Sequence, residues 1–397
     1  MMACVLLHKY KNKYMKAYTP LLFVTLMFAA CNKQDITPIS KEDKLVAISA
    51  KQNNTGNIET RVLNNTLNYP WEILWGPDNM IWFTEREGRV KKMNSETGAV
   101  TLIATIEEVA STTNFNGLLG MAIHPQFSSN PYVYLVYNYF DIQRNYMEKI
   151  VRYTYNGTTL VSPLILVDGI LGRIEGPFIH NGSRLVIGPD MKLYATTGDV
   201  NQREVLPQNI TKLNGKVLRV NLDGSIPSDN PYGNAVWSFG HRNSQGLTYG
   251  NNRWYSSEHG ETTDDEINII EKARNYGWPY VEGYCNLPAE KTFCTANNIR
   301  EPIYAWTPVI APSGIAYYNN NKIAQWKNSL LVASLKGQKL VQMKLSDDGS
   351  KVEDVHEYFN NQFGRLRDVA ISPDGIVYIC TDNGKNQDMI IEVKKRN

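Results

Sequence analysis

The sequence predicts an all-β fold, a six-bladed β-propeller with four-stranded blades. One observation is a unit that recurs six times after Leu63, at intervals of roughly 50 residues, in which a turn containing Pro, Asp, Asn or Gly launches a short strand of aromatic and β-branched residues. The other is the scarcity of helical periodicity, which is confined to residues 264–274. The six units start at Trp75, His124, Gly188, Tyr249, Trp326 and Ser372. A two-domain β protein whose turns are alike by coincidence is the alternative.

The other strands of each blade are expected in alternating segments between these units, such as 89–93 and 217–221. Stacked blades bury both faces of each sheet and leave only short edges. Loops from several blades converge at one end of the central channel in such a fold, so functional residues are expected in loops far apart in the sequence. We therefore assign residues 61–397 to the propeller.

The first 30 residues predict an export signal. Residues 15–20 form a short basic segment, and the apolar run 21–30 is too short for a stable transmembrane helix. Since this run ends Phe28-Ala29-Ala30-Cys31, it is similar to a bacterial lipoprotein signal, in which the cysteine is lipidated and becomes the mature N-terminus. Met15 is then the expected initiator. An ordinary secretory signal followed by a chance cysteine is the alternative.

The lipid anchor at Cys31 predicts a protein of the bacterial cell envelope, attached to the outer membrane and facing the periplasm or the cell surface. No other membrane contact is expected. Residues 31–60, rich in Asn, Lys, Ser and Thr, are expected to form a flexible tether. The formal net charge is +2, and four lysines are the only charged residues before Cys31, so the mature chain carries 2 − 4 = −2. This balance argues against a nucleic-acid partner.

Two cysteines, Cys285 and Cys294, bracket a short polar loop. An oxidising compartment favours a local disulfide between them. Cys380 lies in the apolar run 376–380 and is expected to be a small core residue rather than a reactive thiol.

Polar side chains crowd into residues 240–268, which hold Arg242, Asn243, two histidines and five carboxylates. Such groups need partners, because an unpaired buried polar group costs roughly 1 to 3 kcal/mol. Hard oxygen ligands near glycines suit Ca²⁺, whereas a solvated acidic face is the alternative reading of the carboxylates. Outside this stretch, His180 occupies a turn before the third unit and is a candidate general base.

Four cations form a second candidate cluster. Arg365 and Arg367 are two residues apart in an extended segment and therefore point to the same side. With Arg242 and Lys336 they are expected to converge on one rim and to bind a polyanion, such as a multiply carboxylated small molecule. Separate surface ion pairs are the alternative.

At this point the motifs carry a resemblance. Gly240-His241-Arg242-Asn243 and the acidic run that follows, taken in order with several other motifs, resemble the soluble glucose/aldose sugar dehydrogenases that use pyrroloquinoline quinone. The similar segments are 117–125, 184–190, 215–227, 240–243, 257–258, 264–268, 275–279, 311–313, 334–336 and 365–368. The resemblance implies a six-bladed propeller that oxidises aldoses at the anomeric carbon to lactones, with an external electron acceptor.

The resemblance also implies residue roles. It implies that His180 is the general base and that Arg242 stabilises charge developing on the quinone. The cofactor would be held by Asn243, Lys336, Arg365 and Arg367, together with Arg242. One Ca²⁺ would be bound by the backbone carbonyls of Gly260 and Glu261, and a structural Ca²⁺ by Glu266 and the carbonyl of Tyr276.

Departures from the family pattern concern the substrate. Phe115 replaces a sugar-contacting glutamine, Val309 a cofactor-contacting threonine, and Ile179 an acidic residue before the histidine; His259 and Glu261 replace glutamine and proline. The loop 284–306 is also short, so a broad aldose preference is expected rather than one for glucose. A propeller that only binds glycans or a protein partner is the alternative function.

Overall fold

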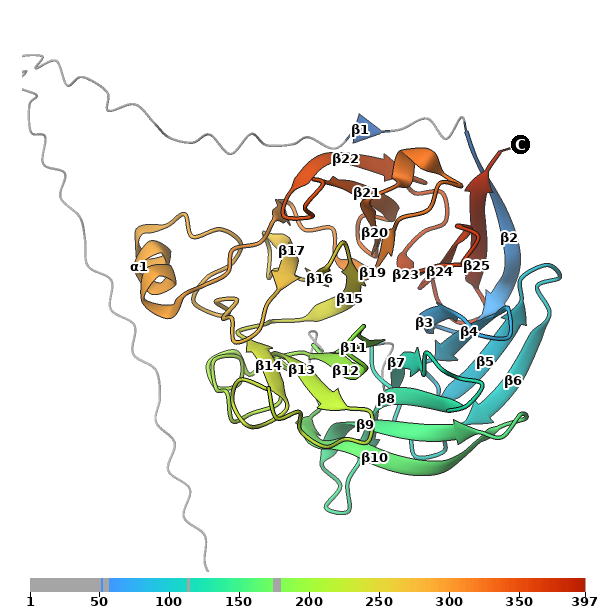
Figure 1. Ribbon diagram of the computed structural model, residues 1–397, viewed down its shortest axis with the longest axis horizontal. Coiled ribbons are helices and arrows are strands. Elements are labelled where there is room, and N and C mark those ends of the chain that lie inside the picture. The colour runs from blue at the N-terminus through green and yellow to red at the C-terminus, as the bar shows by residue number, and fades with distance from the viewer. Residues whose placement is uncertain (1–50, 53–56, 113–114, 174–179, 397) are drawn as a thin grey trace, which may run out of the picture. The chain divides into compact units, whose positions relative to one another are not determined.

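The computed structural model of this chain describes residues 51–52, 57–112, 115–173 and 180–396. The predicted signal segment, the lipidation site Cys31 and Ile179 lie outside these residues. Six sheets form a ring in which each blade is built on four antiparallel strands, and in blades 1 to 5 these four strands follow in chain order from the centre outward (Figure 1). The predicted six-bladed β-propeller is confirmed.

The strands of the first three blades follow one another without interruption. Blade 1 consists of β3 (Pro70–Trp75), β4 (Met80–Glu85), β5 (Arg89–Asn94) and β6 (Val100–Thr105). Blade 2 consists of β7 (Leu118–Ile123), β8 (Tyr132–Phe140), β9 (Tyr146–Tyr155) and β10 (Leu160–Leu171). Blade 3 consists of β11 (Gly182–Ile187), β12 (Lys192–Thr197), β13 (Lys216–Asn221) and β14 (Val236–Phe239).

The last three blades include the N-terminal strands. Blade 4 consists of β15 (Ser244–Gly250), β16 (Arg253–Glu258), β17 (Asp265–Ile270) and β18 (Tyr304–Trp306). Blade 5 consists of β19 (Pro312–Tyr318), β20 (Ser329–Ser334), β21 (Lys339–Leu345) and β22 (Val352–Tyr358), with β1 (Lys51–Gln52) added in parallel to β22. Blade 6 consists of β23 (Leu366–Ile371), β24 (Val377–Thr381), β25 (Asp388–Lys395) and β2 (Ile58–Leu67).

Blade 6 closes the ring with strands from both ends of the chain. Its outermost strand, β2, pairs antiparallel with β25, from Ile58 opposite Lys395 to Leu67 opposite Asp388. Since β2 begins at Ile58, the propeller starts before the boundary that we placed at residue 61.

Each predicted unit corresponds to the turn between the first and second strands of one blade. The second strand lies between neighbouring blades, so both of its faces are buried and mostly apolar. In β4, for example, Ile81, Trp82 and Phe83 are all fully buried. Threonine and serine hydroxyls on the second strands also link blades, as when Thr196 Oγ1 donates to the carbonyl of Ser244, 2.8 Å away. These contacts join neighbouring blades.

One predicted element is wrong. Residues 264–274 were expected to be helical, but the structure forms β17 there, because Ile267, Ile269 and Ile270 pack between blades. The helix α1 (Pro288–Asn297) lies instead in the connection from β17 to β18 and buries none of its residues. No helix among the described residues is long and apolar enough to cross a membrane.

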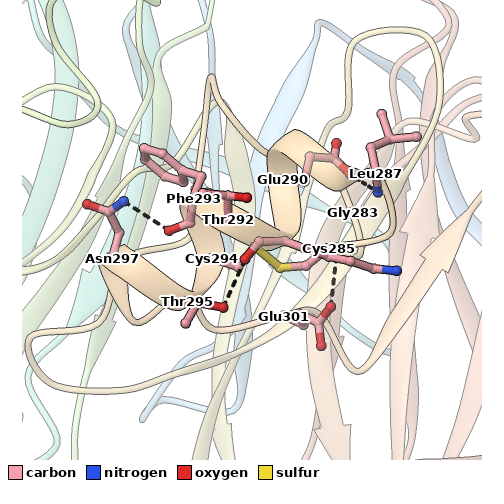
Figure 2. The surroundings of a disulfide bond; sticks show 12 residues. Gly283, Cys285, Leu287, Glu290, Thr292, Phe293, Cys294, Thr295, Asn297 and Glu301 are labelled. Atoms are coloured by element: carbon pink, nitrogen blue, oxygen red, sulfur yellow. Dashed lines mark hydrogen bonds between the residues drawn. A yellow bond between two sulfur atoms is a disulfide. The ribbon is translucent and has the colours of Figure 1, made fainter.

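Helix α1 is held by local contacts. Pro288 starts the helix, and the Glu290 carboxylate accepts a hydrogen bond from the Leu287 backbone N–H at 2.9 Å, which caps the first turn. A disulfide joins Cys285 to Cys294 within the helix, and the Cys285 N–H donates to Glu301 at 2.7 Å (Figure 2). Cys380 is a buried free thiol in blade 6.

Candidate active site

A pocket of about 230 Å³ lies where the first strands of five blades begin and the second strands of two of them end. The two kinds of strand end meet at the same edge because neighbouring strands are antiparallel. The residues that line the pocket are Phe115, His180, Arg242, Asn243, Gln245, His259, Gly260, Glu261, Asp265, Val309, Ala311, Leu335, Arg365 and Arg367. The pocket thus gathers most of the predicted site residues from blades 2 to 6.

His180 is paired with a buried carboxylate. Its Nδ1 lies 2.6 Å from Oδ1 of Asp199, which lies two residues after the end of β12. Asp199 also accepts hydrogen bonds from the Asn201 N–H at 2.7 Å and from Trp278 Nε1 at 2.8 Å. Burial raises the pKa of Asp199, but the hydrogen bond and charge of His180, together with the hydrogen bonds from Asn201 and Trp278, outweigh burial, so the pKa lies below its usual value. An ionised Asp199 orients the ring and leaves Nε2 as the nitrogen that can accept a proton.

The turn that carries Arg242 and Asn243 is built on Glu258. The Glu258 carboxylate accepts hydrogen bonds from the backbone N–H groups of Arg242 and Asn243 and lies 2.9 Å from Nδ1 of His241. The guanidinium of Arg242 lies over the Trp278 ring at 5.2 Å and donates to the carbonyl of His259 at 3.3 Å. Burial lowers its pKa, yet Arg242 remains a cation at neutral pH.

His259 is a neutral wall residue rather than an acid or base. Burial, together with the charges of Arg242, His180 and Arg367, lowers its pKa to about 3. Its Nε2 lies 2.9 Å from the carbonyl of Pro312 and its Nδ1 lies 3.3 Å from Nδ2 of Asn243. Because the carbonyl of Pro312 can only accept a hydrogen bond, Nε2 of His259 carries the proton. Nδ1 therefore accepts a hydrogen bond from Nδ2 of Asn243, which fixes the orientation of that side-chain amide.

Gly260 and Glu261 border the pocket on a tight loop. A side chain at Gly260 would place Cβ 1.9 Å from the carbonyl of Thr263, so only glycine fits. The Asp265 carboxylate fixes this loop by accepting hydrogen bonds from the N–H groups of Gly260 at 2.9 Å and Ala311 at 2.7 Å. Glu261 forms a bidentate ion pair with Arg203 at 2.8 and 2.9 Å.

Glu266 and Tyr276 lie behind the pocket, beside a void of about 10 Å³ that Glu258 and Glu282 also line. Burial, reinforced by the charge of Glu258, raises the pKa of Glu266 to about 8. Both of its carboxylate oxygens accept hydrogen bonds, from the Gly283 N–H and from Asn268, each at 2.8 Å. Within the described part of the chain, no group of three His, Cys, Asp or Glu side chains is arranged to hold a metal ion.

The four predicted cations do not all meet. Arg242, Arg365 and Arg367 line the pocket, but Lys336 is exposed and is not among its lining residues. Arg367 is buried and donates to Gln245 at 2.7 Å.

Sequence reasoning did not name as site residues Trp278, which donates to Asp199, or Asp382, which forms ion pairs with Arg86 and with Arg367 of the pocket wall. Asp382 follows the second strand of blade 6 as Asp199 follows that of blade 3, so strand ends could have indicated it. Trp278 was visible only as part of a motif.

The fold and the pocket together define a propeller enzyme whose site lies at one mouth of the channel. Residues 67–391 match the Glucose / Sorbosone dehydrogenase family, and the chain belongs to it. It is therefore an oxidoreductase of the sugar dehydrogenase class, as the resemblance predicted.

Individual relatives agree. A quinoprotein glucose dehydrogenase B of Acinetobacter calcoaceticus is 35% identical over 417 aligned positions, which cover 83% of this chain and 86% of that protein. An aldose sugar dehydrogenase of Escherichia coli K12 is 30% identical, over 86% of this chain and 94% of that protein. The PQQ-bound form of an aldose sugar dehydrogenase from Streptomyces coelicolor has a TM-score of 0.74 at 30% identity, covering 88% of this chain and 100% of that one.

Proposed function

We propose that this protein oxidises aldose sugars at the anomeric carbon to lactones, using bound pyrroloquinoline quinone and Ca²⁺ and an external electron acceptor. The observation that carries the proposal is the buried His180–Asp199 pair in the wall of a pocket that also contains three arginines. A module that only binds glycans or a protein needs no oriented base beside a cation cluster.

His180 acts as the general base. Its Nε2 takes the proton of the anomeric hydroxyl, and Asp199 stabilises the imidazolium that results, because a buried carboxylate beside a cation is favourable. The quinone, when bound, supplies a two-electron acceptor for the hydride. Arg242 places a positive charge where negative charge develops in the transition state.

The pocket chemistry fits a multiply carboxylated cofactor. Arg365 and Arg367 hold its carboxylates, Asn243 donates a hydrogen bond, and Lys336 contributes from the exposed rim. The main-chain carbonyls of Gly260 and Glu261 hold Ca²⁺, which prefers oxygen ligands of this kind. Glu266 and the Tyr276 carbonyl hold a second, structural Ca²⁺ beside the small void. The hydrogen bonds that Glu266 makes must rearrange for this second ion, so we expect it to bind more weakly than the first.

The wall of the pocket supports a broad substrate range. Phe115, about half exposed, and Val309 stand where the glucose enzymes carry hydrogen-bonding side chains. A pocket that hydrogen-bonds a hydroxyl rejects analogues that lack it, whereas an apolar wall discriminates weakly. We therefore expect several aldoses to react with similar kcat/KM.

Reconstitution tests the proposal. The apo-protein is incubated with the quinone and Ca²⁺, and dye reduction is followed with a panel of aldoses. Turnover that EGTA removes and Ca²⁺ restores is expected. Cofactor binding without turnover on any sugar would favour the binding module, and absence of both would refute the enzyme.

We also propose the envelope location and the lipid anchor at Cys31. The Cys285–Cys294 disulfide supports export, since such bonds persist in oxidising compartments. A Cys31→Ser variant is expected to leave the membrane fraction; unchanged sedimentation would contradict the anchor.

A further inference from the structure

Beneath the pocket, one carboxylate holds three arginines. Asp382 directly follows β24, and its side chain is 5% exposed. Its Oδ1 accepts a hydrogen bond from Arg86 Nη2, and its Oδ2 accepts one from Arg367 Nη2. Arg365 Nη2 lies 3.7 Å from the same Oδ2.

The backbone of Asp382 binds Arg365 as well. Its carbonyl accepts from Arg365 Nε at 3.1 Å, and its N–H donates to the carbonyl of Arg365 at 2.9 Å. Arg365 is therefore tied to Asp382 through both main chain and side chain, while Arg367 is fixed at its other end by Gln245 and Ser313.

The cluster carries more positive than negative charge. Three guanidinium groups share one carboxylate, which leaves a net charge of about +2 next to the pocket. Burial raises the pKa of Asp382, but Arg367 and Arg86 lower it to about 2, so the carboxylate is ionised. Arg86 is buried, and its Nε and Nη1 have no hydrogen-bond partner among the residues that the structure describes.

Such an arrangement is costly unless an anion completes it. Buried like charges repel, and an unpaired buried donor costs free energy that a bound acceptor recovers. A carboxylated ligand in the pocket would compensate the excess charge.

From this geometry we propose that Asp382, with Arg86 behind it, is a positioning residue of the cofactor site: it holds Arg365 and Arg367 in the arrangement that binds the carboxylates of the quinone. The inference rests on the proposed function, which names that cofactor.

For the loss of Asp382, the proposal predicts a change in quinone affinity opposite to the change expected from charge alone. Removing a negative charge beside an anion site should tighten anion binding if only the field matters. If Asp382 positions the arginines, its loss lets them separate, and binding weakens.

The test measures the Kd of pyrroloquinoline quinone for the apo-protein in Ca²⁺, by fluorescence quenching at a temperature well below unfolding. We expect Asp382→Asn to raise Kd about tenfold or more. Asp382→Glu keeps the charge but displaces the carboxylate, and we expect a rise of at least about threefold. At saturating cofactor, kcat should stay within about threefold of wild type, because His180 and Asp199 are untouched.

A matched control removes an Asp–Arg pair elsewhere. Asp190 binds Arg219 at 2.9 and 3.0 Å outside the pocket, so Asp190→Asn should leave Kd within about twofold. Unchanged or tighter binding in both Asp382 variants would overturn this proposal alone. Failure of the wild-type protein to bind the quinone would overturn the proposed function and this inference with it. If Asp382→Asn does not fold, Asp382→Glu decides the question.

Discussion

Substitution of Asp199 by Asn tests the orientation of the proposed base. In the structure Asp199 accepts three hydrogen bonds, from His180, Asn201 and Trp278. Asn has one accepting oxygen. If that oxygen faces His180 and Asn201, the amide NH₂ faces Trp278 Nε1, which is also a donor. If the amide is flipped, its NH₂ instead faces the donors of His180 and Asn201.

The cost has two parts. A hydrogen bond to a charged group contributes about 1.5 to 3 kcal/mol, and a buried donor left facing another donor costs about 1 to 3 kcal/mol. Together these amount to roughly 3 to 6 kcal/mol, and each 1.36 kcal/mol in the barrier is tenfold in rate. We therefore expect kcat/KM of Asp199→Asn to fall about 10²- to 10⁴-fold.

The assay is steady-state dye reduction with holo-protein and one aldose. Quinone affinity is measured in parallel and should change by less than about threefold, because Asp199 does not line the pocket. Trp278→Phe serves as a partial control: it removes one donor and keeps a ring under Arg242, so a smaller loss is expected. A kcat/KM for Asp199→Asn within threefold of wild type would refute the reasoning.

Three further predictions concern His180, the Cys285–Cys294 disulfide and Glu148. His180→Ala should bind the quinone as wild type does but lose turnover by about 10² or more, and unchanged turnover would remove His180 from the role of base. Replacing Cys285 and Cys294 by Ser removes a disulfide that closes a short loop and stabilises the protein by about 3 kcal/mol at most. Since helix α1 buries no residue, we expect faster hydrogen exchange in that loop and a nearly unchanged Tm of the propeller. A large fall in Tm would contradict the view that the disulfide stabilises only this loop. Burial raises the pKa of Glu148 from an ordinary value near 4.5 to about 8 in the folded protein. Between these two pH values the folded state holds a proton that the unfolded state has released. The free energy of unfolding therefore falls as pH rises from about 4.5 through 8. Glu148→Gln should remove that dependence, by up to about 1.4 kcal/mol per pH unit in denaturant unfolding; identical pH dependence in the two proteins would contradict it.

The fold was predictable because its signal is local and repeated. Each blade carries its own turn and mostly apolar second strand, so each unit was supported by five others like it. Residues 264–274 were misjudged because their acidic start is typical of a helix, while the alternation of Ile267 and Ile269 that marks a strand is short. Helix α1 could not be found from an apolar stripe because it buries none of its residues.

The site was predictable only as a set of residues. The motifs indicated His180 and Arg242, but their partners depend on register between strands and on side-chain direction. Whether His180 touches Asp199 follows from the pairing of β11 with β12, in which Gly182 lies opposite Thr197. Lys336 was predicted from its charge and from the family motif at 334–336, and neither decides whether a long side chain points into the pocket.

The closure of blade 6 makes folding depend on the order of synthesis. Strand β2 is synthesised before the rest of the propeller, yet β25, the strand with which it pairs among the described residues, follows the other five blades in the chain. Until β25 is synthesised, the backbone groups of β2 are unpaired. Without β25, blade 6 would keep its inner strands β23 and β24, which contact blades 1 and 5, but β2 would have no strand to join it to the ring.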